Sequence, residues 1–140
     1  GCFDDTGLLE ARMISKKPII GIGQSAFHMA ALRYGKFCVL TTLDASVPVI
    51  KQNIKSQGFG CICETVLASG VPVLELEHNP INAIETISEH IKLIEAQNPD
   101  IAIILGCAGM TNVFWQLQAR HKAFLVDPIL CSARMVGAIL

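Results

Sequence analysis

Short apolar segments alternate with segments of helical periodicity along this chain, and this alternation restricts the possible folds more than any other feature. Residues 37–42 and 101–105 are strand-like, and residues 82–97 form the clearest amphipathic helix. Hydrophobic residues make up 51% of the chain and charged residues only 16%. Short strands that are apolar on both sides are typical of a parallel sheet covered by helices on both faces. We therefore predict an α/β fold.

The pattern assigns a predicted state to most of the chain. We expect strands at residues 18–22, 37–42, 60–66, 101–105 and 123–126, with a short extended piece at 71–76. We expect helices at residues 6–15, 25–34, 46–57, 82–97 and 111–120, and from Pro128 onward. Ligands of such sheets bind beyond the carboxyl ends of the strands. The segments expected there are 2–5, 41–42 and 106–109.

Charge and hydropathy argue against two classes of partner. The net charge is −1, which gives no basic surface for nucleic acid. No apolar run reaches the roughly 20 residues that cross a bilayer, and no signal peptide is visible. We expect a cytoplasmic protein that binds neither membrane nor nucleic acid.

The six cysteines do not form a recognisable metal or disulfide pattern. Cys61 and Cys63 have the wrong spacing for a zinc site, and no second pair follows them. We expect four cysteines to be structural, acting as small apolar side chains: Cys38, Cys61, Cys63 and Cys131. We expect no bound metal.

The remaining two cysteines, Cys2 and Cys107, share one local setting. Cys107 follows the strand at 101–105, lies between Gly106 and Ala108, and precedes a helix. Small neighbours leave its sulfur uncovered, and the start of the following helix favours a thiolate. Cys2 also precedes a helix, in a turn of small or polar residues. Either cysteine could simply fill a tight turn, but the repeated setting indicates a functional pair.

Two motifs carry a family resemblance. Cys-Phe-Asp-Asp-Thr-Gly-Leu at 2–8 and Gly-Cys-Ala-Gly-Met at 106–110 resemble the two cysteine motifs of the aspartate/glutamate/hydantoin racemase superfamily. The closest likeness is to its hydantoin and allantoin racemase branch, which residues 21–28, 39–43 and 70–74 also resemble. The likeness covers essentially the whole chain.

The resemblance implies a cofactor-independent racemase of hydantoin-type or amino-acid substrates. One cysteine, as thiolate, would take the proton from the stereogenic carbon, and the other, as thiol, would return a proton to the opposite face. These roles fall on Cys2 and Cys107. Arylmalonate decarboxylases share the fold but keep one cysteine, so the pair favours racemisation. We expect the small-molecule substrate to contact seven further residues: Asp4, Asp5, Thr6, Thr41, Thr42, Ala108 and Gly109.

The resemblance also implies a domain organisation. Family members have two similar α/β domains with the active site between them, and a substantial stretch before the first cysteine motif. We therefore expect an N-terminally truncated chain. Residues 1–17 would be a remnant of the first domain, 18–127 the second domain, and 128–140 the C-terminal helix of the first. An exposed interdomain face predicts a homo-oligomer.

Two other interpretations stay open. Gly21-x-Gly23-x-x-Ala26 fits a dinucleotide-binding fingerprint, with Asp44 about 20 residues further on as a ribose ligand, which would make the chain an NAD-binding domain. Alternatively, the chain could be a non-enzymatic or inactive truncated domain. No Ser-His-Asp order is recognisable, and His121 is expected on a helix among polar residues.

Overall fold

The computed structural model describes residues 2–139. A four-stranded parallel sheet forms the centre of the molecule. The strands are β1 (Phe37–Thr41), β2 (Cys63–Ala68), β3 (Ala102–Leu105) and β4 (Phe124–Val126), in the order β2-β1-β3-β4. Every neighbouring pair is parallel; Val39, for example, pairs with Val66 on one side and Ile104 on the other. The predicted α/β fold class is confirmed.

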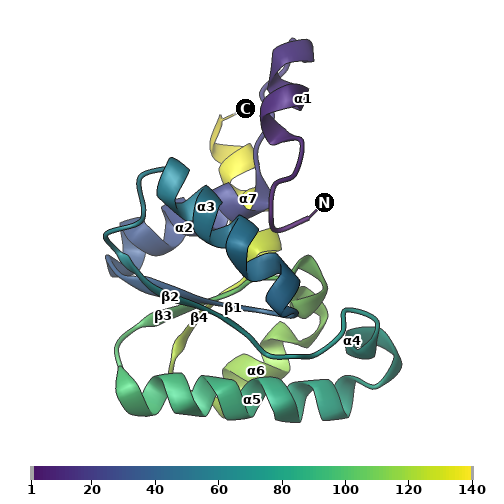
Figure 1. Cartoon of the computed structure of the whole chain (residues 1–140), viewed down its shortest axis with the longest axis vertical. Helices are drawn as coiled ribbons and strands as arrows, with labels where there is room; N and C mark the ends of the chain where they lie inside the picture. The colour runs from purple at the N-terminus through teal and green to yellow at the C-terminus, as the bar shows by residue number, and fades with distance from the viewer. Residues whose placement is uncertain (1, 140) are drawn as a thin grey trace.

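Helices cover both faces of this sheet (Figure 1). α2 (Ile22–Tyr34), α3 (Val47–Ser56) and α7 (Pro128–Ile139) lie on one side, and α5 (Pro80–Gln97) and α6 (Phe114–Arg120) lie on the other. Short helical turns, η1 (Asp44–Ser46), α4 (Glu75–His78) and η2 (Ala108–Val113), follow strand ends. α1 (Leu8–Ile14) stands apart from the sheet.

Alternating side chains of the central strands build two separate cores. Cys38, Leu40 and Ile103 pack toward α5, which contributes Ile87 and Ile91, and all five are fully buried. The intervening residues pack against α2 and α3. These include Phe37, Val39, Ala102 and Ile104. The strict alternation explains why these strands read as unbroken apolar runs: both of their faces are covered.

Two predicted strands are wrong. Residues 18–21 are not part of the sheet and lead directly into α2. The edges of the sheet are β2 and β4, and neither pairs with this segment. The segment is held instead by Arg12, which donates to the carbonyl of Ile19 at 3.0 Å. The predicted extended piece at 71–76 is a turn followed by α4. The strand predicted at 60–66 is present but lies later, at β2.

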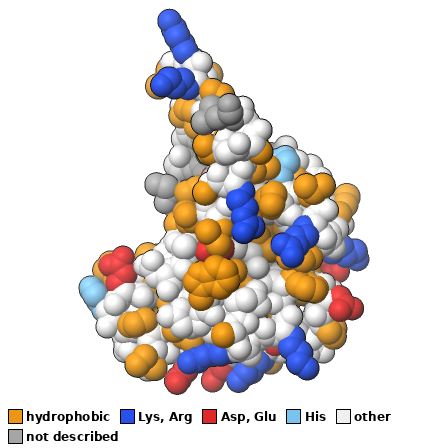
Figure 2. Space-filling model, turned by 180° about the vertical axis from the view of Figure 1, so that it is seen from behind, with side chains coloured by type: hydrophobic (Ala, Val, Ile, Leu, Met, Phe, Trp, Pro, Cys, Tyr) orange, Lys and Arg blue, Asp and Glu red, His pale blue; other side chains and the backbone are white. Residues whose placement is uncertain are grey.

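α1 and the end of α7 form a narrow projection at one end of the molecule (Figure 1). Both contribute to one hollow, lined among others by Arg12 from α1 and by Met135 and Ile139 from α7. α1 buries no residue; Met13 is 79% exposed and Ile14 is 87% exposed. Figure 2 shows hydrophobic side chains along this projection. The assignment of 1–17 and 128–140 to another domain stays a prediction.

None of the helices within residues 2–139 has the length and apolarity needed to span a membrane.

Candidate active site

Cys2 and Cys107 lie on the wall of one cavity of about 360 Å³ beyond the carboxyl ends of β1 and β3. Of the other residues predicted for the site, the structure brings five to the same wall: Asp4, Thr41, Thr42, Ala108 and Gly109. Asp5 and Thr6 lie outside this cavity and line a different hollow. Residues not predicted complete the wall: Phe3, Ser46, Ile50, Val73, Glu77 and Gly106.

The turn that carries Cys107 is held tightly against β1. The N–H of Gly106 donates to the carbonyl of Leu40 at 2.8 Å, and the hydroxyl of Thr41 donates to the carbonyl of Gly106 at 2.8 Å. A Cβ atom on Gly106 would lie 2.7 Å from Cγ1 of Val39. Only glycine therefore lets the two strand ends approach so closely. The hydrogen bond from the Thr41 hydroxyl to Gly106 thus positions the turn.

η2 begins immediately after Cys107, which is itself half-buried. Within residues 2–139, the N–H groups of Ala108 and Gly109 donate to no backbone carbonyl. Free amides at the start of a helical turn attract negative charge. The sulfur of Cys107 therefore lies beside donors that could stabilise a developing oxyanion.

The segment that carries Cys2 is anchored by its neighbours. Phe3 is 3% exposed and meets Phe27 of α2 edge to face, with ring centroids 5.6 Å apart. The side-chain amide of Asn53 on α3 donates to the carbonyl of Asp4 at 2.5 Å. Contacts with two helices thus fix the backbone around Cys2 over the end of the sheet.

A third anchor of this segment accounts for the glycine motif at residues 21–26. The carboxylate of Asp5 accepts hydrogen bonds from the N–H groups of Gly23, at 3.1 Å, and Gln24, at 2.7 Å, at the start of α2. A Cβ atom on Gly21 would lie 2.4 Å from this carboxylate, and one on Gly23 would lie 2.2 Å from the carbonyl of Phe3. The two glycines make room for the Cys2 segment.

The NAD-binding alternative is therefore wrong. A dinucleotide fingerprint needs a strand before its glycines and free amides for the pyrophosphate. Residues 18–21 are not a strand, and the amides of Gly23 and Gln24 are bound by Asp5. An internal carboxylate takes the place that a phosphate would take.

The surroundings of Cys2 favour its protonated form. Burial of the thiol raises its pKa most, and the carboxylate of Asp4 and the nearby Cys107 raise it further, although the N–H of Asp4 acts in the opposite direction. Oδ1 of Asp4 is buried and has no hydrogen-bond partner within residues 2–139. The pKa shift therefore favours the thiol form of Cys2, whose side chain is itself exposed.

The four other cysteines lie away from this cavity. Burial raises the pKa of Cys38 to about 12 and the pKa values of Cys63 and Cys131 to about 11. Cys38 and Cys131 are buried in the core, as predicted for structural cysteines, and Cys63 is half-buried. The prediction is wrong for Cys61, which is exposed because it lies in the turn before β2.

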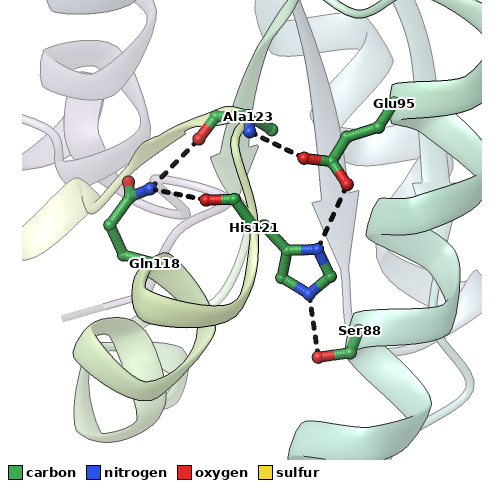
Figure 3. A network of polar contacts seen from close by, with 5 residues as sticks. All are labelled: Ser88, Glu95, Gln118, His121 and Ala123. Carbon is green, nitrogen blue, oxygen red and sulfur yellow. Dashed lines mark hydrogen bonds and ion pairs between the residues drawn. The ribbon is translucent and has the colours of Figure 1, made fainter.

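A buried polar network that the sequence did not reveal lies between α5 and the segment before β4 (Figure 3). His121 bonds Glu95 through Nδ1 at 3.2 Å and Ser88 through Nε2 at 2.9 Å, and Glu95 also accepts from the N–H of Ala123 at 2.7 Å. His121 is 8% exposed and Ser88 is 5% exposed. The expected helical position of His121 is wrong, because α6 ends at Arg120 and His121 follows it. The order resembles a hydrolase triad, but the buried Ser88 hydroxyl offers a substrate no access. The network joins α5 to the segment between α6 and β4.

Known proteins are similar to this chain in both sequence and fold. The profile of the Asp/Glu/Hydantoin racemase family matches residues 1–136. The chain is 37% identical to a hydantoin racemase of Rhizobium meliloti over 139 residues, which are 99% of this chain and 58% of that protein. It is 26% identical to a hydantoin racemase of Pseudomonas sp. (strain NS671), again over 99% of this chain, and 56% of that protein.

Solved structures agree. An allantoin racemase from Klebsiella pneumoniae superposes with a TM-score of 0.87 at 33% identity, over 99% of this chain and 57% of that one. An allantoin racemase from Pseudomonas fluorescens gives a TM-score of 0.80 at 26% identity, over 94% of this chain and 66% of that one. The chain thus spans a little over half the length of the curated relatives it matches. The chain belongs to the Asp/Glu/hydantoin racemase family.

Proposed function

We propose that this chain supplies both proton-transfer groups of a cofactor-independent racemase, namely Cys2 and Cys107. The observation that carries the proposal is their position on the wall of one cavity of about 360 Å³. Racemisation by two bases needs an acid and a base on opposite sides of one carbon atom. The two cysteines come from distant parts of the sequence and from different turns, so they can approach a substrate from different sides.

The proposed reaction needs one cysteine as the thiol and the other as the thiolate. Burial and Asp4 raise the pKa of Cys2, which favours the thiol form of Cys2. For one enantiomer, Cys107 then takes the proton from the substrate, and Cys2 delivers its proton to the other face. The roles exchange for the opposite enantiomer.

The negative charge that develops on the substrate needs donors nearby. The N–H groups of Ala108 and Gly109 fit this role, because both residues line the cavity and neither amide has a backbone acceptor within residues 2–139. Thr42, on the same wall, is a further substrate contact. Asp5 and Thr6, also expected to contact substrate, would instead act through the segment that they help to form.

The cavity wall favours a neutral ring over an acidic amino acid. The part of the wall formed by residues 2–139 contains two carboxylates, Asp4 and Glu77, and no Lys or Arg. Aspartate and glutamate each carry two carboxylates, and this wall has no cation to bind them. A neutral hydantoin-type ring brings no carboxylate to this wall. The matched relatives named hydantoin racemase and allantoin racemase support this substrate class.

Two broader features complete the proposal. The exposed apolar residues of α1, such as Leu9, Met13 and Ile14, support assembly with further protein, and we propose a homo-oligomer. The six cysteines all have free thiols in the structure, which fits a cytoplasmic protein.

The test follows hydrogen-to-deuterium exchange at the stereogenic carbon of each enantiomer of a 5-substituted hydantoin, in D2O, with the complete protein. Cys2→Ser and Cys107→Ser should each abolish racemisation, and each should block exchange of one enantiomer more than the other. Cys61→Ser, which changes an exposed thiol outside the cavity, is the matched control and should stay active. Mild and equal losses in the two variants would contradict the two-base mechanism. A complete protein without any exchange would favour the non-enzymatic alternative.

A further inference from the structure

A second cavity of about 360 Å³ lies at the β4 edge of the sheet, between α2, α6 and α7, and it shares no lining residue with the cysteine cavity. Its volume falls in the range of small-molecule sites. None of its lining residues has a part in the proposed proton transfer. The proposed racemase reaction therefore assigns no role to this cavity.

The edge of β4 cannot simply accept another strand here. The side-chain amide of Gln118 donates to the carbonyl of Ala123 at 3.1 Å and accepts from the N–H of Leu125 at 3.3 Å. These two backbone groups are the ones that a residue of an added parallel strand would bind. Gln118 thus replaces the missing strand at this point, which argues against a peptide strand as the occupant.

Aromatic side chains form an ordered wall of the cavity. The rings of Tyr34 and Phe124 are stacked with centroids 4.9 Å apart, and the guanidinium of Arg33 lies over the Tyr34 ring at 5.2 Å. Trp115 packs edge to face on Phe114 with centroids 4.9 Å apart, and yet it is 69% exposed. Tyr34 is thus covered by its neighbours, whereas Trp115 and Phe124 (46% exposed) present flat apolar surfaces on which a ring can stack.

The charge of the wall is positive. Arg33, Lys122 and Arg134 line the cavity, and within residues 2–139 none of them forms an ion pair. The one acidic side chain on the wall is Asp127, which is 3% exposed. Its Oδ1 accepts from the N–H groups of Ile129 and Leu130 and from the hydroxyl of Thr111, and its Oδ2 is buried and has no partner within residues 2–139. In Figure 2, hydrophobic side chains and Lys or Arg side chains lie next to one another near the middle of the view.

We propose that this cavity binds a small organic anion that carries a ring, such as an aromatic carboxylate. The ring stacks on the exposed surfaces of Trp115 and Phe124, and the carboxylate pairs with the cations that line the cavity. Guanidinium groups bind carboxylates through two parallel hydrogen bonds, which makes Arg33 and Arg134 the principal anion ligands. The site is independent of the proposed racemase reaction.

The test uses the fluorescence of Trp115, which is the single tryptophan of the chain and lies on the cavity wall. Phenylacetate is titrated into the full chain, and phenylacetamide, which has the same ring without the charge, is the matched ligand. Phenylacetate should change the fluorescence saturably, and phenylacetamide should bind several-fold more weakly. Arg33→Gln and Arg134→Gln should each weaken phenylacetate binding roughly fivefold, as expected for a partly exposed ion pair.

Lys55→Gln removes one exposed positive charge from α3, away from the cavity, and is the control for net charge. It should leave the phenylacetate affinity unchanged. Circular dichroism verifies that each variant is folded. The proposal is overturned if the two ligands bind equally, if neither gives a saturable change, or if Lys55→Gln weakens binding as much as the arginine variants.

Discussion

Asp5 provides the most informative perturbation, because it links the folding of the chain to the position of Cys2. Its carboxylate accepts from the N–H groups of Gly23 and Gln24, and its own backbone has a φ of 50°. Asp and Asn tolerate this left-handed conformation, whereas alanine does so at a cost of about 1 kcal/mol. Loss of the helix-capping acceptor costs about 1–2 kcal/mol. We therefore expect Asp5→Ala to lower the free energy of unfolding by about 2–3 kcal/mol.

Asp5→Asn separates the contribution of geometry from the contribution of charge. Burial raises the pKa of Asp5, and this outweighs the hydrogen bonds from the amides of Gln24, Gly23 and Ile22, which lower it. Because the folded-state pKa is raised, ionisation of Asp5 lowers the stability at neutral pH, and the stabilisation comes from the geometry of the hydrogen bonds. Asparagine keeps the left-handed backbone and one acceptor oxygen, so we expect it to cost only about 1 kcal/mol or less.

Urea unfolding of the wild type and the two variants, followed by circular dichroism, measures both values by linear extrapolation. Hydrogen exchange at the amides of Gly23 and Gln24 should accelerate in Asp5→Ala, because these amides lose their acceptor. The reasoning is refuted if Asp5→Ala costs less than about 0.5 kcal/mol, or if Asp5→Asn is as damaging as Asp5→Ala.

Two further predictions concern other contacts. Gly106→Ala should destabilise the chain by about 2 kcal/mol, because the new Cβ would meet Val39 and Thr41; urea unfolding checks this, and an unchanged midpoint would show that the strand ends are free to separate. Glu95→Gln should cost about 1 kcal/mol at neutral pH. Burial acts to raise the pKa of Glu95, but the hydrogen bonds from Ala123 and His121 hold it below its ordinary 4.5. The stabilisation is therefore present above about pH 4.5 and is lost as the pH falls through the lower folded value. Unfolding at a series of pH values should show wild type and variant converging in acid; a constant difference would contradict the pKa shift.

Features encoded by local patterns were predicted well, and those that depend on distant contacts were not. The strand β3 and the helix α5 could be predicted because the apolar side chains that each of them buries lie close together in the sequence. Residues 18–22 have the composition of a strand, but their state depends on whether a sheet edge is free, which no local pattern reveals.

The site shows the same division. Cys107 follows β3, so its place at the carboxyl edge of the sheet follows from the local pattern and the topology. Cys2 reaches the same cavity through contacts of its segment with α2 and α3, which no local pattern reveals. The role of Asp5 depends on a contact with residues 23 and 24, which are distant in sequence. The glycines at 21 and 23 looked like a dinucleotide motif because an internal carboxylate and an external phosphate use the same helix amides. Ser88, Glu95 and His121 likewise meet only in the folded chain.

The central claim is that the sulfur atoms of Cys2 and Cys107 reach one substrate atom. A short reagent that links two thiols, such as dibromobimane, tests this directly when the product is digested and its linked peptides are identified by mass spectrometry. The account predicts a link between residues 2 and 107 that disappears in Cys2→Ser and in Cys107→Ser. Separate modification of the two thiols without a link, or a link formed only between Cys61 and Cys63, would contradict it.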